Sequence, residues 1–168
     1  MDQGPEGVYR LLREEYTMKK LIACLLAAAC LLGLCACGAQ ENVTLDLAEI
    51  YSQMAEATDE ELVQISAERV LDLYGIKPDQ CAEQLIYSYN SGMMAAEIWL
   101  IKASSAEAMT ELKAKAEKRL EYLDAESITY SPEMNKVVKK AQIIVRGDYL
   151  AMICSQNVEA LAKVFNEA

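Results

Sequence analysis

The stretch QIIVRGDYLAMIC, residues 142–154, decides the fold because it contains two apolar runs that only a short turn separates. Gln142 to Arg146 and Tyr149 to Cys154 each have the length of a strand, and Gly147-Asp148 joins them. A two-residue loop with glycine in first place favours a type II′ turn between antiparallel strands. The stretch therefore predicts a tight β-hairpin.

A second hairpin is predicted earlier in the chain. Residues 85–90 alternate between two sets of side chains, Leu85, Tyr87 and Tyr89 against Ile86 and Ser88. Residues 95–101 are rich in Ile, Trp and Leu, and Ser91-Gly92 lies between the two runs as a turn. Two hairpins of this kind predict a four-stranded antiparallel sheet.

Two helices are predicted before the first hairpin. Apolar residues recur at helical spacing from Leu47 onward. Thr58 and Glu61, three residues apart, predict a capping box for a second helix. This helix would carry Leu62, Ile65 and Leu73 and would end at Gly75, because glycine tolerates the left-handed backbone of a helix end.

Three further helices follow from the same reasoning. Ser104 and Glu107 form a capping-box pattern at the start of a long helix, and Ser131-Pro132 places proline at the first position of a shorter one. The last helix carries an inward stripe of Val158, Leu161, Ala162 and Phe165. The complete order predicts an α+β domain in which a four-stranded antiparallel sheet packs against helices.

The N-terminal part has the features of a bacterial export signal. Lys19 and Lys20 precede an uncharged apolar run over residues 21–34, which is shorter than the about 20 residues that a membrane-spanning helix needs. We therefore expect residues 18–36 to be a signal peptide that is removed. Residues 1–17 are expected to be an upstream extension, because Met18 is the better start.

The residues that follow resemble the bacterial lipobox. Leu34-Cys35-Ala36-Cys37-Gly38 has an aliphatic residue three positions before Cys37 and a small residue directly before it. We expect cleavage before Cys37 and attachment of diacylglycerol to its thiol, because two acyl chains hold a protein stably on a bilayer. This places the protein on the outer face of the cytoplasmic membrane. Residues 37–44 would form a polar tether and residues 45–168 a single α+β domain.

The charge and the cysteines limit the partners. Residues 37–168 contain 22 acidic and 12 basic residues, a net charge of −10, which argues against a nucleic-acid partner and against direct adhesion to anionic lipid headgroups. The membrane would be reached through the lipid on Cys37. Cys81 and Cys154 lie in apolar patterns, so we favour buried free thiols over a disulfide, which export would permit.

The residue types exclude several classes of chemistry. The chain contains no histidine, which excludes Ser-His-Asp and Cys-His machinery and every zinc site built on imidazole. No phosphate-binding loop, dinucleotide fingerprint or EF-hand spacing occurs. We therefore expect no cofactor and no metal, and we assign no catalytic residue. Carboxylate or Ser-Lys chemistry remains open.

Two groups of side chains are candidate binding residues. Glu97 is an acid in an otherwise apolar strand, with Lys102 nearby; the alternative is an acid that faces solvent or pairs with a cation across the sheet. Tyr87 and Tyr89 share one face of their strand, and Trp99 would join them in an aromatic binding surface if the register allows. The hydrophobic core is the alternative place for these three rings.

Five short motifs carry a family resemblance: LYGI at 73–76, AEI at 96–98, IK at 101–102, YSPE at 130–133 and VRGDY at 145–149. Together they resemble an uncharacterised lipoprotein domain of clostridial-type Gram-positive bacteria, a domain of unknown function. The resemblance spans about residues 45–165 and implies attachment to the cell surface. It implies no activity, so it carries over no catalytic residue.

Two hypotheses about function follow. The first is a lipid-anchored, non-enzymatic module that binds a ligand or a partner in the cell envelope. The alternative is an enzyme or accessory that uses carboxylates on cell-wall material, which requires a deep cleft holding Glu97 beside a second acid. The solute receptor of a transporter is disfavoured, because such receptors usually enclose their ligand between two larger lobes.

Overall fold

The structure is a computed structural model that describes residues 43–89 and 95–168. The expected upstream extension, the signal peptide and Cys37 lie outside the described residues, and so does the predicted turn at Ser91-Gly92. The described residues belong to one compact unit, residues 41–168. No helix in this part of the chain is long and apolar enough to cross a membrane.

Five strands form one antiparallel sheet within the described residues, in the order β1-β2-β3-β5-β4. The strands are β1 (Leu62–Gln64), β2 (Cys81–Tyr89), β3 (Glu97–Ala103), β4 (Gln142–Arg146) and β5 (Tyr149–Cys154). The predicted hairpin of β4 and β5 is confirmed: Arg146 lies opposite Tyr149, and Gly147 has the positive φ of 56° that glycine adopts without strain. The predicted α+β class is confirmed, but the sheet has five strands rather than four.

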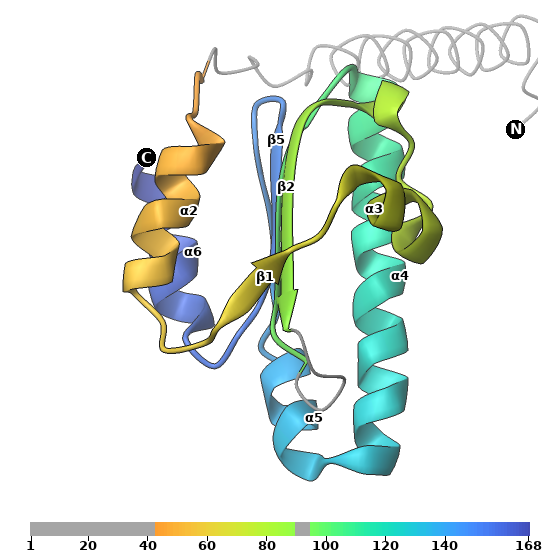
Figure 1. Ribbon diagram of the computed structural model, residues 1–168, viewed down its shortest axis with the longest axis vertical. Helices are drawn as coiled ribbons and strands as arrows, with labels where there is room; N and C mark the ends of the chain where they lie inside the picture. The colour runs from red at the N-terminus through yellow and green to blue at the C-terminus, as the bar shows by residue number, and fades with distance from the viewer. Residues whose placement is uncertain (1–42, 90–94) are drawn as a thin grey trace, which may run out of the picture. The chain divides into compact units, whose positions relative to one another are not determined.

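The helices lie on both faces of this sheet (Figure 1). They are α2 (Leu47–Glu56), α3 (Ala67–Tyr74), α4 (Ala106–Tyr130), α5 (Pro132–Val138) and α6 (Val158–Glu167), with a 3₁₀ turn, η1, at Pro78–Gln80. Helices α2 and α6 cover one face, and α3 and α4 cover the other (Figure 1).

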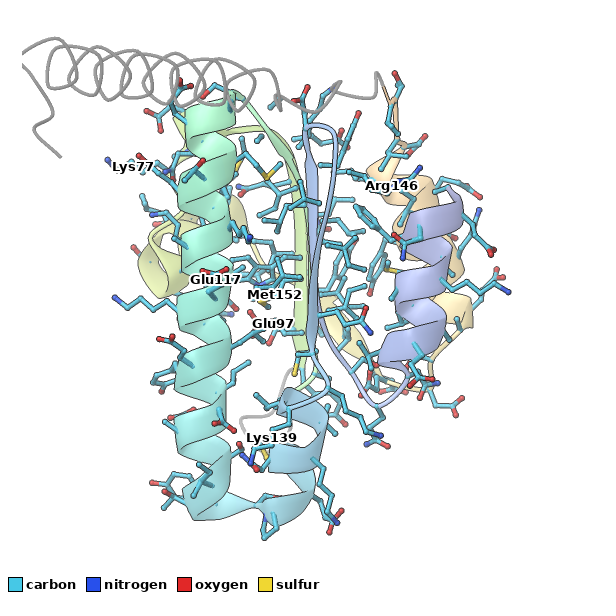
Figure 2. The ribbon with its side chains drawn as sticks, turned by 180° about the vertical axis from the view of Figure 1, so that it is seen from behind. Lys77, Glu97, Glu117, Lys139, Arg146 and Met152 are labelled. Atoms are coloured by element: carbon cyan, nitrogen blue, oxygen red, sulfur yellow. The ribbon has the colours of Figure 1, made fainter. Side chains whose placement is uncertain are left out.

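Each face of the sheet has its own hydrophobic core, because successive side chains of a strand point to opposite faces. Along β3, Ile98 and Leu100 pack with α2 and α6, whereas Trp99 and Ile101 pack with α3 and α4. The labelled side chains of Glu97 and Met152 lie on the α4 side of the sheet (Figure 2). Arg146 lies on the α6 side, where its guanidinium donates hydrogen bonds to the carbonyls of Phe165 and Ala168.

The fifth strand replaces part of a predicted helix. The capping box of Thr58 and Glu61 does not form; the Thr58 hydroxyl instead accepts a hydrogen bond from the Glu60 amide. Residues 62–64 pair with the outer edge of β2, which would otherwise expose its backbone donors and acceptors. The helix therefore starts only at α3, where Ser66 is the N-cap, and it ends as predicted at Gly75 with a φ of 64°.

The other predicted helix boundaries hold with one shift. Ser105, not Ser104, caps α4, because the Ser104 hydroxyl donates a hydrogen bond to the Asp79 carbonyl. Helix α5 starts at Pro132 with Ser131 as its cap, as predicted. The predicted stripe of α6 is buried: Val158, Leu161, Ala162 and Phe165.

The two cysteines are free thiols, as the apolar pattern predicted. Cys81 pairs with Ala103 and Cys154 pairs with Glu97, at opposite ends of β3. Six residues of extended strand span roughly 20 Å, whereas the Cα atoms of a disulfide lie within about 7 Å of each other. A bridge between these cysteines is therefore excluded by the fold.

Candidate functional site

Glu97 is the one acidic residue in the buried stretch of β3. It is the first residue of the strand and lies on the same face as Trp99 and Ile101, toward α4. Only 1% of its surface is exposed. A buried carboxylate needs a cation and hydrogen-bond donors close by.

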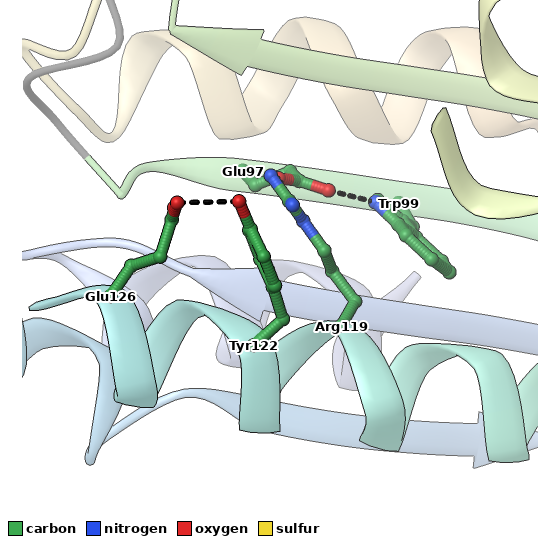
Figure 3. A network of polar contacts seen from close by, with 5 residues as sticks. All are labelled: Glu97, Trp99, Arg119, Tyr122 and Glu126. Atoms are coloured by element: carbon green, nitrogen blue, oxygen red, sulfur yellow. Dashed lines mark hydrogen bonds and ion pairs between the residues drawn. The ribbon is translucent and has the colours of Figure 1, made fainter. Parts of the chain in front are cut away.

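Arg119 of α4 supplies the cation (Figure 3). Its Nε and Nη2 donate to Glu97 Oε2 at 3.1 and 2.8 Å, and the Trp99 indole donates to Oε1 at 2.5 Å. Both carboxylate oxygens are therefore hydrogen-bonded. Glu97 therefore does not face solvent; it pairs with a cation, and this cation comes from a helix packed on the sheet and not from a neighbouring strand.

Lys102 is not the partner of Glu97. It lies five residues further along β3 and therefore points to the opposite face of the sheet. Its Nζ lies 5.2 Å from the centre of the Tyr149 ring, a cation–π contact on that face. The cation comes from a helix 22 residues away in the chain, which strand spacing does not indicate.

Two tyrosine rings hold the guanidinium of Arg119 in place. Its Cζ lies 5.2 Å from the centre of the Tyr74 ring and 5.3 Å from that of Tyr122. Tyr74 also packs against Trp99, with ring centres 4.8 Å apart. Burial, followed by the nearby Glu97 carboxylate, raises the pKa of the Tyr74 hydroxyl, so this group stays protonated at neutral pH.

Arg119 forms part of the wall of a pocket with a volume of about 570 Å³. The pocket lies between the end of α3 and one side of α4, and no acidic residue lines it. Its lining consists of Leu73, Tyr74, Gly75, Lys115, Lys118, Arg119 and Tyr122. Its size is in the range of small-molecule sites, which is about 300–1,000 Å³.

The residues that α4 contributes occur at helical spacing. Lys115, Lys118, Arg119 and Tyr122 follow one another at steps of three, one and three, so they lie on one face. A charged helix face with acids and lysines at i,i+4 spacing, such as Glu111 and Lys115, is typical of a solvated surface, so the spacing alone does not predict this grouping. Glu111 and Lys118 are indeed exposed, but the face also makes contacts: Lys115 Nζ donates to the Gly75 carbonyl at 2.7 Å, and Glu111 accepts a hydrogen bond from Gln80.

The register does not allow Trp99 to join Tyr87 and Tyr89 in one aromatic surface. Tyr87 lies opposite Ile98 and Trp99 lies opposite Ile86, so Tyr87 and Trp99 point to different faces of the sheet. Trp99 is fully buried. Tyr87 stacks on Tyr51 of α2, and the two ring planes are 6° from parallel. Trp99 therefore belongs to the core beneath α3 and α4, whereas Tyr87 lies against α2 on the other face.

Tyr89, the third member of the predicted surface, lies opposite Leu62 of β1 and is partly buried. It contributes to neither the pocket nor the ion pair. Of the four candidate residues, the structure therefore brings Glu97 and Trp99 together and separates both tyrosines from them.

A second pocket lies near the start of α5 and the end of β5. Its volume is about 340 Å³, and Glu60, Glu133 and Ser155 are among its lining residues. Glu60 accepts hydrogen bonds from the Ser155 hydroxyl and the Gln156 amide, which ties the segment before β1 to the end of β5. This acid therefore has a structural role. Within residues 43–89 and 95–168, no group of three or more acidic or cysteine side chains is placed to hold a metal ion.

The chain was compared with known proteins. It matches no curated protein and no solved structure at a significant level. Residues 55–155 match the family described as Domain of unknown function (DUF4358), and this range includes the ion pair and the whole pocket. Because the match covers more than half of the chain, the protein belongs to the DUF4358 family.

Proposed function

We propose that this protein is an exported lipoprotein, attached through Cys37 to the outer face of the cytoplasmic membrane, and that its domain binds a ligand without converting it. The pocket between α3 and α4 is the proposed binding site. The export signal and the lipobox over residues 18–38 support the attachment. The domain would then present its pocket to the cell envelope.

The proposal of a binding role rests mainly on the hydrogen bonds that Glu97 already makes within the domain. Its two oxygens accept hydrogen bonds from Trp99 and Arg119. We therefore assign Glu97 the role of fixing the position of Arg119 in the pocket wall, and not that of a proton donor or acceptor for a substrate. The side chains around the pocket are cations, tyrosines and a leucine. Such groups attract and orient a ligand.

The alternative, an enzyme that uses carboxylates on cell-wall material, has less support. It requires Glu97 and a second acid in one cleft. Glu97 does not line the pocket beside it, and no acid does. We therefore place the binding module first.

The attachment is tested by intact-mass analysis of the protein extracted from membranes of a Gram-positive host. The wild type is expected to begin at Cys37 and to carry a diacylglyceryl group, and a Cys37→Ala variant is expected to lack the lipid. A wild-type chain that keeps residues 21–34 and has no lipid would show that the run is an uncleaved anchor.

The binding role is tested with a dialysable extract of the cell envelope. Molecules that the full protein retains during equilibrium dialysis are identified by mass spectrometry, and their masses are expected to match those in the untreated extract. New products that appear with the wild type and are lost in a Glu97→Gln variant would favour the enzyme instead.

A further inference from the structure

The Arg119 guanidinium has a second hydrogen-bonding edge that the ion pair does not use. A guanidinium carries five N–H donors, and Glu97 accepts from Nε and Nη2 alone. Nη1 has no hydrogen-bond partner among the described residues, where Gln84 Oε1 is the only buried side-chain nitrogen or oxygen without one. An unpartnered Nη1 is therefore not fully buried, and Arg119 is one of the residues that line the pocket.

Two lysines of the pocket lining form no ion pair with a carboxylate of the described residues. Lys118 lines the pocket and has no ion pair or hydrogen bond within the described part of the chain. Lys115 donates to the Gly75 carbonyl, which uses one of its three N–H groups and leaves its charge in place. The pocket is therefore cationic although the chain carries a net charge of −10.

Apolar surface borders these cations. Leu73 and Tyr122 line the same pocket, and they are 54% and 51% exposed. Binding pockets for organic ligands typically combine apolar or aromatic side chains with a small number of polar groups. The pocket thus offers one region for an anion and an adjoining region for an apolar group.

We propose that this pocket binds a phosphate monoester carried on an apolar or aromatic group. The phosphate oxygens accept hydrogen bonds from Arg119 Nη1 and Lys118 Nζ, and the organic group lies on Leu73 and Tyr122. A dianionic phosphate matches the two lysine charges that have no carboxylate partner, whereas a single carboxylate matches only one. This inference rests on the proposed function and deepens it, because it names the ligand class for the same site.

Arg119 is suited to this role because it is held before the ligand arrives. Glu97 fixes one edge of the guanidinium, and Tyr74 and Tyr122 contact the same group. A side chain that is already ordered loses little conformational entropy when it binds. The buried ion pair would therefore serve to position the donor that the ligand uses.

The test titrates the lipid-anchored protein, purified in neutral detergent, with phenyl phosphate, inorganic phosphate or phenol, followed by NMR of the small molecule. Phenyl phosphate is expected to show saturable binding, inorganic phosphate weaker binding, and phenol none. Lys118→Ala is expected to weaken phenyl phosphate binding about tenfold, the effect of losing one charge-assisted hydrogen bond. Lys113→Ala is the matched control, since Lys113 lies on the same helix, is 55% exposed and does not line the pocket.

Three results would overturn the inference: no saturation up to about 10 mM phenyl phosphate, equal affinity in the wild type and Lys118→Ala, or equal binding of phenol. Equal binding of inorganic phosphate would overturn the apolar part. Different results would contradict the proposed function. Release of phenol from phenyl phosphate would disprove a purely binding role and retain the site, and loss of the lipid anchor would leave the titration unchanged.

Discussion

Arg119 connects the core of the domain to its surface. Its side chain is 23% exposed, and its partner Glu97 has a side chain that is 2% exposed. The ion pair is thus buried on the carboxylate side and reaches solvent on the guanidinium side. A substitution at Arg119 should therefore mainly lower the stability of the domain, and a change in ligand binding by the pocket should be the secondary effect.

We predict that Arg119→Met destabilises the domain by about 3–5 kcal/mol, because it leaves a buried carboxylate without its cation. The double variant Glu97→Leu with Arg119→Met should recover much of that loss, since apolar groups replace both charges. The unfolding free energies of the single and the double variant are measured by urea unfolding, which the fluorescence of Trp99, the single tryptophan, reports. Lys118→Ala should stay within about 0.5 kcal/mol of the wild type. Equal losses in the single and double variants would show that packing, not the charge, is responsible.

Tyr51 gives the domain a sensitivity to alkali. Burial, and then the neighbouring Tyr87, raises the pKa of Tyr51 to about 12, whereas an unfolded tyrosine ionises near 10. The folded state therefore holds the proton more tightly. Its contribution to stability is complete below about pH 10 and is lost as the pH rises from about 10 to about 12.

Tyr51→Phe should therefore reduce the fall in unfolding free energy across this pH window. Phenylalanine keeps the ring that stacks on Tyr87 and has no proton to lose. Urea unfolding at several pH values within the window provides the measurement. An equally steep fall in the variant would assign the alkaline sensitivity to other groups, such as Tyr74.

At the scale of single elements, the end of α3 determines one wall of the pocket. Gly75 has a φ of 64°, and its carbonyl accepts the hydrogen bond from Lys115. A Cβ added at this position would lie 3.8 Å from Lys115 Nζ, which is ordinary contact. Space is therefore available, and the backbone conformation alone selects glycine.

We predict that Gly75→Ala lowers the free energy of unfolding by about 1–2 kcal/mol, the cost of a left-handed backbone for a residue with a Cβ. Gly75→Asn should cost less, because asparagine tolerates this conformation better. Urea unfolding compares the two variants. A larger loss for asparagine than for alanine would contradict the conformational explanation.

At the scale of the whole molecule, the sheet separates the two thiols. Cys81 and Cys154 lie near opposite ends of β3, so the peptides that contain them should have the same masses with and without reductant. Burial raises the pKa of Cys154 to about 12 and that of Cys81 to about 11. At about pH 8 few thiolates are present, and thiolates are the reactive form.

Both cysteines should therefore react slowly with iodoacetamide in the folded protein and rapidly in urea. Raising the pH should accelerate Cys81 before Cys154, because its pKa is lower and it is only partly buried. Peptide mass mapping distinguishes the two positions. A mass that is lower by two hydrogens before reduction would indicate a bridge and contradict the sheet topology.

The sequence alone was sufficient to predict those helices and strands whose determining residues lie close together in the chain. The β4–β5 hairpin depends on two apolar runs and on Gly147-Asp148 between them. The stripe of α6 and the start of α5 at Pro132 are equally local, because the period of 3.6 and the proline ring act on near neighbours. The export signal and the lipobox at Cys37 are likewise properties of the sequence, and they remain predictions.

The tertiary structure decided which side chains meet. The register between β2 and β3 places Trp99 opposite Ile86, and a shift of one residue would move it to the face of Tyr87. The fifth strand exists because the outer edge of β2 is available to residues 62–64. Arg119 reaches Glu97 only because α4 packs on the face to which that acid points. Each outcome depends on contacts between distant segments, and the spacing of residues along one segment contains no information about them.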